Sequence, residues 1–396
     1  MREAVIVAAK RTPVGRANRG VLKHMRVEDF ARPVIQELLK TTGVKGEEVN
    51  DLVVGCAMPE AEQGMNIARI IGLAAGLPEI VPAVTVNRFC SSGLETIAIA
   101  ATRIIAGFQD IVIAGGAETM SMIPMGGNKI VGNPNSVGTV AMGAYCSMGN
   151  TAENVVERYG KEFNLTREEL DKFALRSQER ALNALKEGYF KSQYVPIEYS
   201  TWENGKKVTG VLKEDEGPRP SSMESLASVK PAFRVKNGVV TAGNSSQMDD
   251  AAAFVLLMSA EEAKKRGLKI MAYFRDYQVI GVDPEVMGIG PAFAIPKLLQ
   301  HAGLKYDDID LYEINEAFAS QAVYSVRKMG IEHLMERVNV NGGAIALGHP
   351  LGCTGAKLTT QLAYELERRN GRYGVVSMCI GGGMGAAGLF ERPKQK

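Results

Sequence analysis

Cys90 is the first residue whose type and position suggest chemistry. It follows the apolar run Ala83–Val86, typical of a buried strand, and it stands where Ser91–Ala106 begins a predicted helix. At such a turn, backbone N–H groups and the positive end of a helix lower a thiol pKa and favour the nucleophilic thiolate. The alternative is a buried structural cysteine, which is the commoner fate of a free thiol. The position at a strand-to-helix turn favours the nucleophile.

A histidine lies in a second turn that is rich in glycine. His349 belongs to the segment Asn341–Gly352, in which Asn341 and His349 are the only strongly polar side chains. An imidazole in such a turn is either tied to the backbone or placed for a task. Near neutral pH it is a suitable base for a thiol. His349 is therefore a candidate partner for a cysteine nucleophile.

Two more polar groups follow predicted strands. Cys379 comes after the strand Gly374–Met378 and before the glycine run Gly381–Gly383, whose free N–H groups can face an anionic oxygen. Asn315 follows the strand Asp310–Ile314, at the sheet edge where α/β proteins usually have their sites. The chain thus contains two thiols, a base and N–H donors for an anion.

Other ligand motifs are excluded. Gly383–Gly388 matches G-x-G-x-x-G, but too few residues follow it for the βαβ unit of a dinucleotide site. No glycine run ends in the Gly-Lys-Ser/Thr of a phosphate-binding loop. The four histidines are scattered and none stands at ligand spacing from a cysteine, so we expect no metal site.

The elements that must position these residues alternate between strands and helices. Strands are predicted at Ala4–Ala8, Asp51–Cys56 and Asp110–Ala114, the last closed by a pair of glycines, and helices at Glu28–Thr41, Met65–Ala75 and Arg167–Glu187. Apolar strands between helices predict a mostly parallel sheet that is covered on both faces.

This pattern occurs twice. Leu38–Val49 resembles Leu298–Ile309, and Val84–Asn87 resembles Val338–Asn341 at nearly the same offset. The alternative is chance similarity, but the shared order favours a duplication. The middle of the chain is rich in Gly, Asn, Pro and charged residues, as in an inserted lid or binding surface. We expect an N-terminal half over residues 1–119 and 247–268, an inserted loop domain over 120–246, and a C-terminal half over 269–396.

Composition narrows the class of protein. The 396 residues exceed one ordinary domain, and 45% hydrophobic with 23% charged residues is globular. Lys+Arg 46 against Asp+Glu 44 argues against nucleic-acid binding, and no apolar run is long enough for a membrane span. Five widely spaced cysteines and no signal peptide predict reduced thiols in the cytoplasm.

Five segments together resemble the thiolase signatures, in order along the chain: Asn87–Leu94, Gly115–Ser121, Asn315–Ala319, Asn341–Gly352 and Cys379–Gly385. On these segments the chain is identified as a member of the thiolase family, with a resemblance that runs from Glu3 to Phe390. The resemblance implies a five-layer α/β/α/β/α fold of two duplicated halves, with a loop domain inserted in the first. This agrees with the repeat.

The resemblance also implies a reaction. Cys90 would attack the 3-keto carbon of a 3-ketoacyl-CoA and hold the acyl group, His349 would accept its proton, and Cys379 would protonate the departing acetyl-CoA enolate. The N–H groups of Cys90 and Gly381 would form one oxyanion site, and His349 with a water held by Asn315 the other. Coenzyme A is then a co-substrate, and no permanently bound cofactor is expected.

Six further residues are assigned to acyl-CoA binding by the resemblance. Those that match the nucleotide and pantetheine tunnel are Arg219, Ser246, Phe233 and Phe318, and those near the thioester are Met148 and Met287. Core packing is the alternative for Met and Phe. Ser147 stands where short-chain biosynthetic thiolases have a histidine, which favours a degradative enzyme with a wider acyl pocket.

Three alternatives remain open to different degrees. An acetyl-CoA acetyltransferase that makes acetoacetyl-CoA would use the same residues. A ketoacyl-synthase-like condensing enzyme has no need of Cys379 as a carbon acid, and an acyl-CoA carrier has no use for two thiols and an imidazole. The resemblance further implies a homodimer or tetramer, with Ile97–Ile105 and Asp110–Ala114 expected in doubly buried positions, and a hydratase/dehydrogenase partner of fatty acid β-oxidation.

Overall fold

The computed structural model describes residues 2–203 and 205–394. One mixed ten-stranded sheet forms its centre, in the order β10-β11-β12-β9-β1-β8-β5-β3-β4, with β2 paired to β8. The strands are β1 (Ala4–Arg11), β2 (Gly15–Arg16), β3 (Asp51–Gly55), β4 (Ala83–Val86), β5 (Ile111–Thr119), β8 (Asp249–Ser259), β9 (Ala272–Gly281), β10 (Leu311–Ile314), β11 (Tyr373–Ile380) and β12 (Met384–Glu391).

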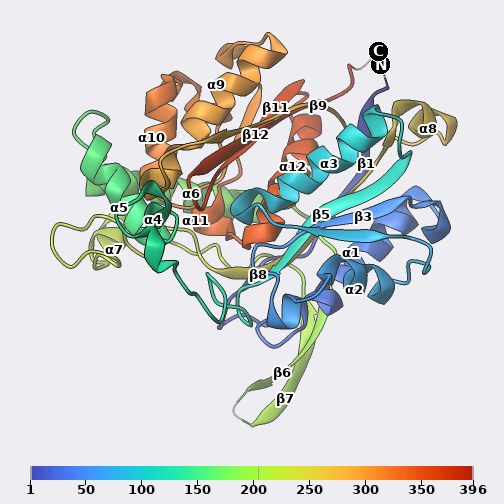
Figure 1. Cartoon of the computed structure of the whole chain (residues 1–396), viewed down its shortest axis with the longest axis horizontal. Coiled ribbons are helices and arrows are strands. Elements are labelled where there is room, and N and C mark those ends of the chain that lie inside the picture. The colour runs from blue at the N-terminus through green and yellow to red at the C-terminus, as the bar shows by residue number, and fades with distance from the viewer. Residues whose placement is uncertain (1, 204, 395–396) are drawn as a thin grey trace.

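Helices cover the outer faces of this sheet and also lie between its two halves (Figure 1). They are α1 (Val27–Thr42), α2 (Ile67–Ala74), α3 (Ser92–Ile105), α4 (Val140–Gly143), α5 (Met148–Tyr159), α6 (Arg167–Lys186), α7 (Met223–Ala227), α8 (Ala260–Lys265), α9 (Pro291–Ala302), α10 (Ala319–Met329), α11 (Ala344–Leu347) and α12 (Leu351–Arg368). None of these described helices has both the length and the apolar character that crossing a bilayer requires.

The sheet consists of two halves with the same topology. They meet where β1 pairs with β9 at only two positions, Val5 with Tyr273 and Ile6 with Ala272. The first half runs β4-β3-β5-β8-β1, and the second runs β10-β11-β12-β9 and is extended beyond β10 by a parallel bridge from Tyr312 to Val338. Because parallel and antiparallel pairs also follow in the same order, the structure confirms the duplication.

The two halves enclose a central layer of two helices. α3 packs against β3, β5 and β8, and α12 packs against α3 and against strands of both halves. α1 and α2 cover the outer face of the first half, and α9 covers that of the second. The resulting five layers match the predicted architecture, but the expectation of a mostly parallel sheet was wrong, because the strands around the junction of the two halves pair antiparallel. α3 begins just after Cys90 and α12 just after His349, so the central layer carries both residues.

The inserted segment covers one side of this core. It holds α4 to α7 and a hairpin of β6 (Ile197–Glu203) and β7 (Lys206–Leu212), which projects away from the body in Figure 1. α6 packs against α10 and α11 of the second half. The insertion therefore contributes directly to the walls around the turn that carries His349.

Two predictions about strands of the first half were wrong in detail. β5 does not end at Ala114 but continues through the glycine pair, with Gly115 opposite Phe254 and Gly116 opposite Ala253. Instead, the glycines allow α12 to approach the strand closely, since a Cβ at Gly116 would collide with the carbonyl oxygen of Gly352. β4 was expected to be buried, but it is the last strand of the sheet and is half-buried.

Candidate active site

Cys90 lies in a short 3₁₀ turn, Phe89–Ser91, between β4 and α3. Phe89 has a φ of +43°, a left-handed conformation that is costly for a residue with a side chain. Hydrogen bonds hold the turn: the Phe89 N–H donates to Asn87 Oδ1 (2.8 Å), and the Ser92 hydroxyl donates to the Phe89 carbonyl (2.7 Å). The strained backbone is thus fixed around the cysteine.

The Cys90 sulfur faces backbone N–H groups but is buried. Burial raises the pKa of the thiol to about 11, although the N–H groups of Gly381 and of Cys90 itself lower it. The expectation of a lowered pKa was therefore wrong, because the cost of desolvating a thiolate exceeds the stabilisation by these donors. At neutral pH the resting group is a thiol that already points toward two N–H donors.

The surroundings of His349 select one tautomer. The Thr354 hydroxyl donates to the Pro350 carbonyl (3.0 Å), so its oxygen accepts Nδ1–H of His349 at 2.6 Å. The other ring nitrogen, Nε2, lies 3.3 Å from Asn315 Nδ2 and accepts from that amide. Burial and the positive charge of Lys357 lower the imidazole pKa to about 3. The ring is therefore neutral, with an unprotonated Nε2.

Asn315 stands at the end of β10 with its two amide atoms in different situations. Its Nδ2 contacts His349, whereas its Oδ1 is buried and accepts no hydrogen bond from the described residues. Buried acceptors are nearly always paired in native proteins. This oxygen is accordingly available to a donor that enters the site.

Cys379 is buried inside β11, whereas the sequence suggested that the strand ends just before it. Its thiol donates to Gln321 Oε1 at 3.6 Å, and the same oxygen accepts the Ala317 N–H at 3.1 Å. Burial raises the pKa of Cys379 well above its ordinary value, and a negative charge on Cys90 raises it further. Both thiols of the site are thus protonated at rest.

Apolar side chains close the site around Cys379. Met287 and Phe318 share a buried cluster with it, and Met148 packs against that cluster. A Cβ on Gly381 would lie 3.5 Å from Met148 Sδ, so this methionine also covers the glycine turn. Phe233 and Phe318 pack edge to face with ring centroids 6.1 Å apart. Four of the predicted acyl-CoA contacts, Met148, Met287, Phe233 and Phe318, therefore lie together.

The other predicted contacts lie at the margin. The Ser246 N–H donates to the Ala317 carbonyl (2.9 Å), next to Phe318. Arg219 is half-buried and its N–H donates to Gln178 Oε1 of α6 (3.0 Å), while burial and the nearby Arg16 lower its pKa. Ser147 is exposed at the start of α5 and makes no capping hydrogen bond.

Two buried carboxylates brace the site; the sequence indicated Glu316 at the end of its strand, whereas Glu118 was missed. Glu118 accepts N–H groups of Ala57 (2.7 Å) and Gly352 (2.8 Å), joining β3 and β5 to the start of α12. Glu316 accepts the Ser177 hydroxyl (2.6 Å) and the Ile345 N–H (3.3 Å), joining β10 to α6 and α11. Each lies inside a recognised segment, which was the available signal, but its partners are distant in the sequence.

Thr354 and Gln321 were missed as well. Thr354 follows His349 by five residues, and Gln321 follows Asn315 by six. A polar residue so close to a functional one in a helix is a weak signal on its own. Only the packed structure shows that the side chains meet.

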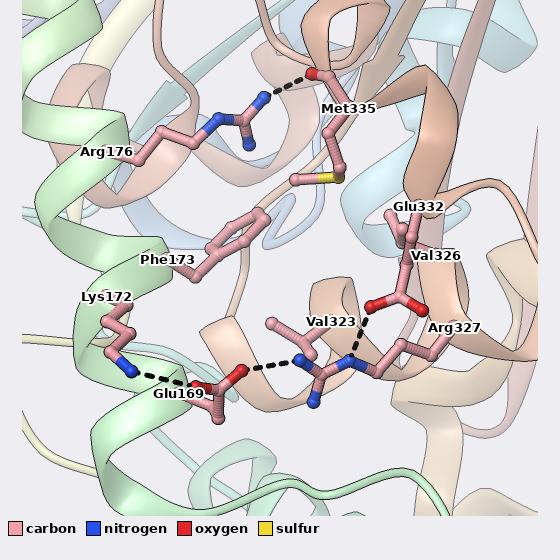
Figure 2. A pocket seen from close by; sticks show the side chains of 9 residues that line it. All are labelled: Glu169, Lys172, Phe173, Arg176, Val323, Val326, Arg327, Glu332 and Met335. Atoms are coloured by element: carbon pink, nitrogen blue, oxygen red, sulfur yellow. Dashed lines mark hydrogen bonds and ion pairs between the residues drawn. The ribbon is translucent and has the colours of Figure 1, made fainter.

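A surface pocket of about 190 Å³ between α6 and α10 is not part of this site. Figure 2 shows Arg327 between Glu169 (2.6 Å) and Glu332 (3.0 Å), with Arg176 donating to the Met335 carbonyl (2.5 Å). None of the predicted site residues lines it. Its ion pairs fasten α6 to the second half, which supports the contact between α6 and Glu316.

Two buried thiols, a neutral imidazole and converging N–H groups are what an enzyme needs to carry an acyl group on sulfur. The fold that holds them is a duplicated α/β sandwich. Two family models match the chain, the thiolase N-terminal domain over residues 4–261 and the thiolase C-terminal domain over residues 268–392. The chain belongs to the thiolase family, and it is an acyltransferase.

Individual relatives agree along nearly the whole chain. It is 53% identical to the 3-ketoacyl-CoA thiolase of Bacillus subtilis (strain 168), a match that covers 99% of this chain and 100% of the relative. It is 48% identical to 3-ketoacyl-CoA thiolase A, peroxisomal, of Mus musculus, covering 99% and 91%. The crystal structure of the Bacillus anthracis acetyl-CoA acetyltransferase superposes with a TM-score of 0.87 at 42% identity and covers 99% of both chains.

Proposed function

We propose that this thiolase cleaves 3-ketoacyl-CoA with coenzyme A, giving acetyl-CoA and an acyl-CoA shortened by two carbons. The observation that carries the proposal is the Cys90 sulfur, which faces the N–H groups of Cys90 and Gly381 from inside a buried turn. The names of the relatives in Bacillus subtilis and Mus musculus support the same substrate class.

In the first step, Cys90 attacks the 3-keto carbon and its proton passes to Nε2 of His349. Because thiol and imidazole are both neutral at rest, the proton moves as the S–C bond forms. The oxygen of the former ketone becomes an anion, which the N–H groups of Cys90 and Gly381 stabilise.

In the second step, the bond between C2 and C3 breaks and acetyl-CoA leaves as an enolate. Protonated His349 now presents an N–H to the enolate oxygen, together with a water held by Asn315, while Cys379 donates its thiol proton to C2. Incoming CoA then attacks the acyl-Cys90 thioester. Its thiol proton restores Cys379, and the proton on His349 returns to Cys90, so both residues regain their starting forms.

The acyl-CoA lies along the wall formed by the inserted segment. We assign the pantetheine to Phe233, Phe318 and Ser246, and the nucleotide phosphates to Arg219. The half-buried guanidinium of Arg219 supports this assignment, because a bound phosphate would offset its desolvation. Met148 and Met287 would contact the acyl thioester.

A mass-spectrometric trapping experiment tests the proposal. We expect incubation with an acyl-CoA donor to add one acyl group to the peptide that contains Cys90, and Cys90→Ala to abolish both this label and thiolysis. Cys146→Ala is the matched control, because Cys146 is a free, half-exposed thiol that has no role in the proposed mechanism. Full acylation of the Cys90→Ala variant would refute the assignment.

The second candidate function is that of an acetyl-CoA acetyltransferase, favoured by the close superposition on the Bacillus anthracis enzyme of that name. The two functions differ in acyl chain length. We propose that kcat/KM for medium-chain 3-ketoacyl-CoAs exceeds that for acetoacetyl-CoA, since each buried CH₂ contributes up to about 0.8 kcal/mol. Initial thiolysis rates across a chain-length series decide, and a sharp maximum at acetoacetyl-CoA would support the second function.

Ser147→His provides a separate test of the acyl pocket. If residue 147 limits chain length, the variant shifts its preference toward acetoacetyl-CoA. The exposure of Ser147 in the structure favours a smaller effect than a residue inside the pocket would give. An unchanged profile would remove residue 147 from the specificity argument and leave the thiolase chemistry untouched.

We place the enzyme in the cytoplasm because Cys90 and Cys379 both act as free thiols in this mechanism, which requires a reducing compartment. Its substrate is a 3-ketoacyl thioester, so an enzyme that hydrates and oxidises an acyl-CoA must supply it. A hydratase/dehydrogenase of fatty acid β-oxidation is the partner that fits this chemistry.

A further inference from the structure

Lys357 is a buried lysine in α12 that the proposed mechanism does not use. It is 1% exposed, and its Nζ donates to the Gly348 carbonyl at 3.0 Å and lies 3.4 Å from the Leu347 carbonyl. Within the described part of the chain, no carboxylate oxygen lies within 4 Å of this nitrogen. A buried ammonium is costly unless it is paired, yet this one contacts only the two carbonyls immediately before His349 among the described residues.

The same short segment is held from the other side. Asp249, fully buried at the start of β8, accepts the His349 N–H through Oδ2 at 2.9 Å. Its carboxylate packs so closely on Gly348 that a Cβ there would collide with it. The backbone of residues 347–349 is therefore clamped between Lys357 and Asp249, while Thr354 and Asn315 hold the ring itself.

The charges that face Lys357 leave a net positive charge behind the imidazole. Arg11 and Asp215 form a bidentate pair at 2.8 and 3.0 Å and neutralise each other. The Cys353 thiol is neutral, because burial raises its pKa to about 12. Burial also raises the pKa of Asp249 to about 7, so its negative charge is lost below neutral pH. Burial and the charge of Arg11 lower the pKa of Lys357 itself, and in its protonated form Lys357 is the remaining charge that, after burial, opposes protonation of His349.

We propose that Lys357 is a positioning residue for His349: it fixes the carbonyls that precede the imidazole, and its charge keeps the ring unprotonated until Cys90 reacts. The inference rests on the proposed function, in which His349 is the base. It concerns the free enzyme, however, so it is measured without any turnover.

The test is the titration of His349 by NMR of histidine-labelled enzyme between about pH 4.5 and 8. The chain has four histidines, so few signals need assignment, and His349→Asn identifies the relevant one. We expect no titration of His349 in this window for the wild type. In Lys357→Met the midpoint rises by about two pH units and enters the window, because a nearby like charge has been removed.

Three variants make the result decisive. Lys357→Arg keeps the charge and the donors and retains the wild-type titration. Lys172→Met removes the same charge from an exposed site and leaves His349 unchanged. Lys357→Gln keeps a donor without the charge, and it replaces Lys357→Met if near-ultraviolet circular dichroism shows that the methionine variant is misfolded.

The experiments distinguish failure of the proposed role of Lys357 from failure of the proposed function. A His349 midpoint that is the same with and without the lysine charge would overturn the role of Lys357. Absence of acyl-Cys90 in the wild type would overturn the proposed function, whatever the titration shows. If both proposals hold, Lys357→Met acylates Cys90 more slowly than the wild type below about pH 5, where its imidazole becomes protonated, with the half-saturating acyl-CoA concentration unchanged.

Discussion

The two thiols of the site differ in the partners that their sulfur atoms meet. Cys90 faces N–H donors, which suit a sulfur that becomes anionic and an oxyanion beside it. Cys379 meets the amide oxygen of Gln321, an acceptor that orients an S–H group. The first environment fits a nucleophile, and the second fits a proton donor.

Cys379→Ala separates these roles. The variant should still acylate Cys90 from an acyl-CoA donor, but C–C cleavage and exchange of the C2 protons of acetyl-CoA should fall at least about a hundredfold, because only the carbon acid is lost. Mass spectrometry follows the acyl group and deuterium exchange by NMR follows C2. A fall of both reactions by the same factor would contradict the division of labour.

The raised pKa of Cys90 predicts a specific pH dependence. Below a pKa of about 11 the thiolate fraction rises about tenfold for each pH unit, so alkylation of Cys90 by iodoacetamide should rise in that way from pH 7 to 9. Peptide mass spectrometry measures the rate in the absence of substrate. A flat rate over this range would mean that thiolate and imidazolium already exist as an ion pair.

Thr354→Val tests the tautomer of His349. Without the oxygen that accepts Nδ1–H, the ring is free to turn or to exchange its proton to Nε2, so acylation should slow at least about tenfold while KM stays near its wild-type value. Stopped-flow acylation rates measure the change. Thr354→Ser retains the hydroxyl and should restore most of the activity, whereas equal losses in both variants would point to packing.

At the scale of elements, the central layer packs the turn that carries Cys90 against α12, which begins just after His349. α3 and α12 approach each other at glycines, and a Cβ on Gly93 would lie 2.8 Å from the Gly352 carbonyl and 2.8 Å from the Ala356 nitrogen. A small residue is therefore required at this contact. The spacing of the two helices therefore sets how closely the thiol turn approaches the start of α12.

Gly93→Ala should accordingly weaken both stability and acylation. Overpacking against a rigid helix backbone costs about 1–3 kcal/mol in the free energy of unfolding, and the shift of α3 moves Cys90. Urea denaturation and acylation rates measure the two effects. The control is Gly281→Ala, where an added Cβ meets no atom within 4 Å. Wild-type stability in Gly93→Ala would show that the helices can separate without cost.

At the scale of the whole molecule, we propose that the first half of the sheet continues into a second copy. Its last strand, β4, is a short apolar strand whose outer edge pairs with no other strand among the described residues, and such an edge is a template for pairing between chains. β5, which contains the segment expected to be doubly buried, lies between β3 and β8 and has no free edge. The strand available for pairing is therefore β4.

A dimer or a larger closed assembly should be the state in solution, since two-fold symmetry is the commonest way to satisfy such an edge. Light scattering at micromolar concentration should give a mass of at least two chains of 42.6 kDa. A single-chain mass would contradict the proposal and would leave β4 as an unpaired edge.

The sequence alone determined the family and the layered, duplicated architecture. Residue types at strand ends identified Cys90, His349, Cys379 and Asn315 as candidates, and the repeated segments indicated two halves with an insertion. These features are local, because hydrophobic periodicity, glycine runs and short motifs are properties of neighbouring residues. The family followed from the order of the motifs along the chain.

The tertiary structure decided the environment of each group. Burial by distant segments raises the pKa of the Cys90 thiol, which reverses what its turn suggested. Burial also lowers the pKa of the His349 imidazole, so that the ring is neutral as a base must be. Thr354 and Lys357 matter because packing brings them to the imidazole turn. The strand position of Gly116 requires a glycine because the start of α12 packs directly against it. Desolvation and close packing depend on which remote segments meet, and no short stretch of sequence encodes that.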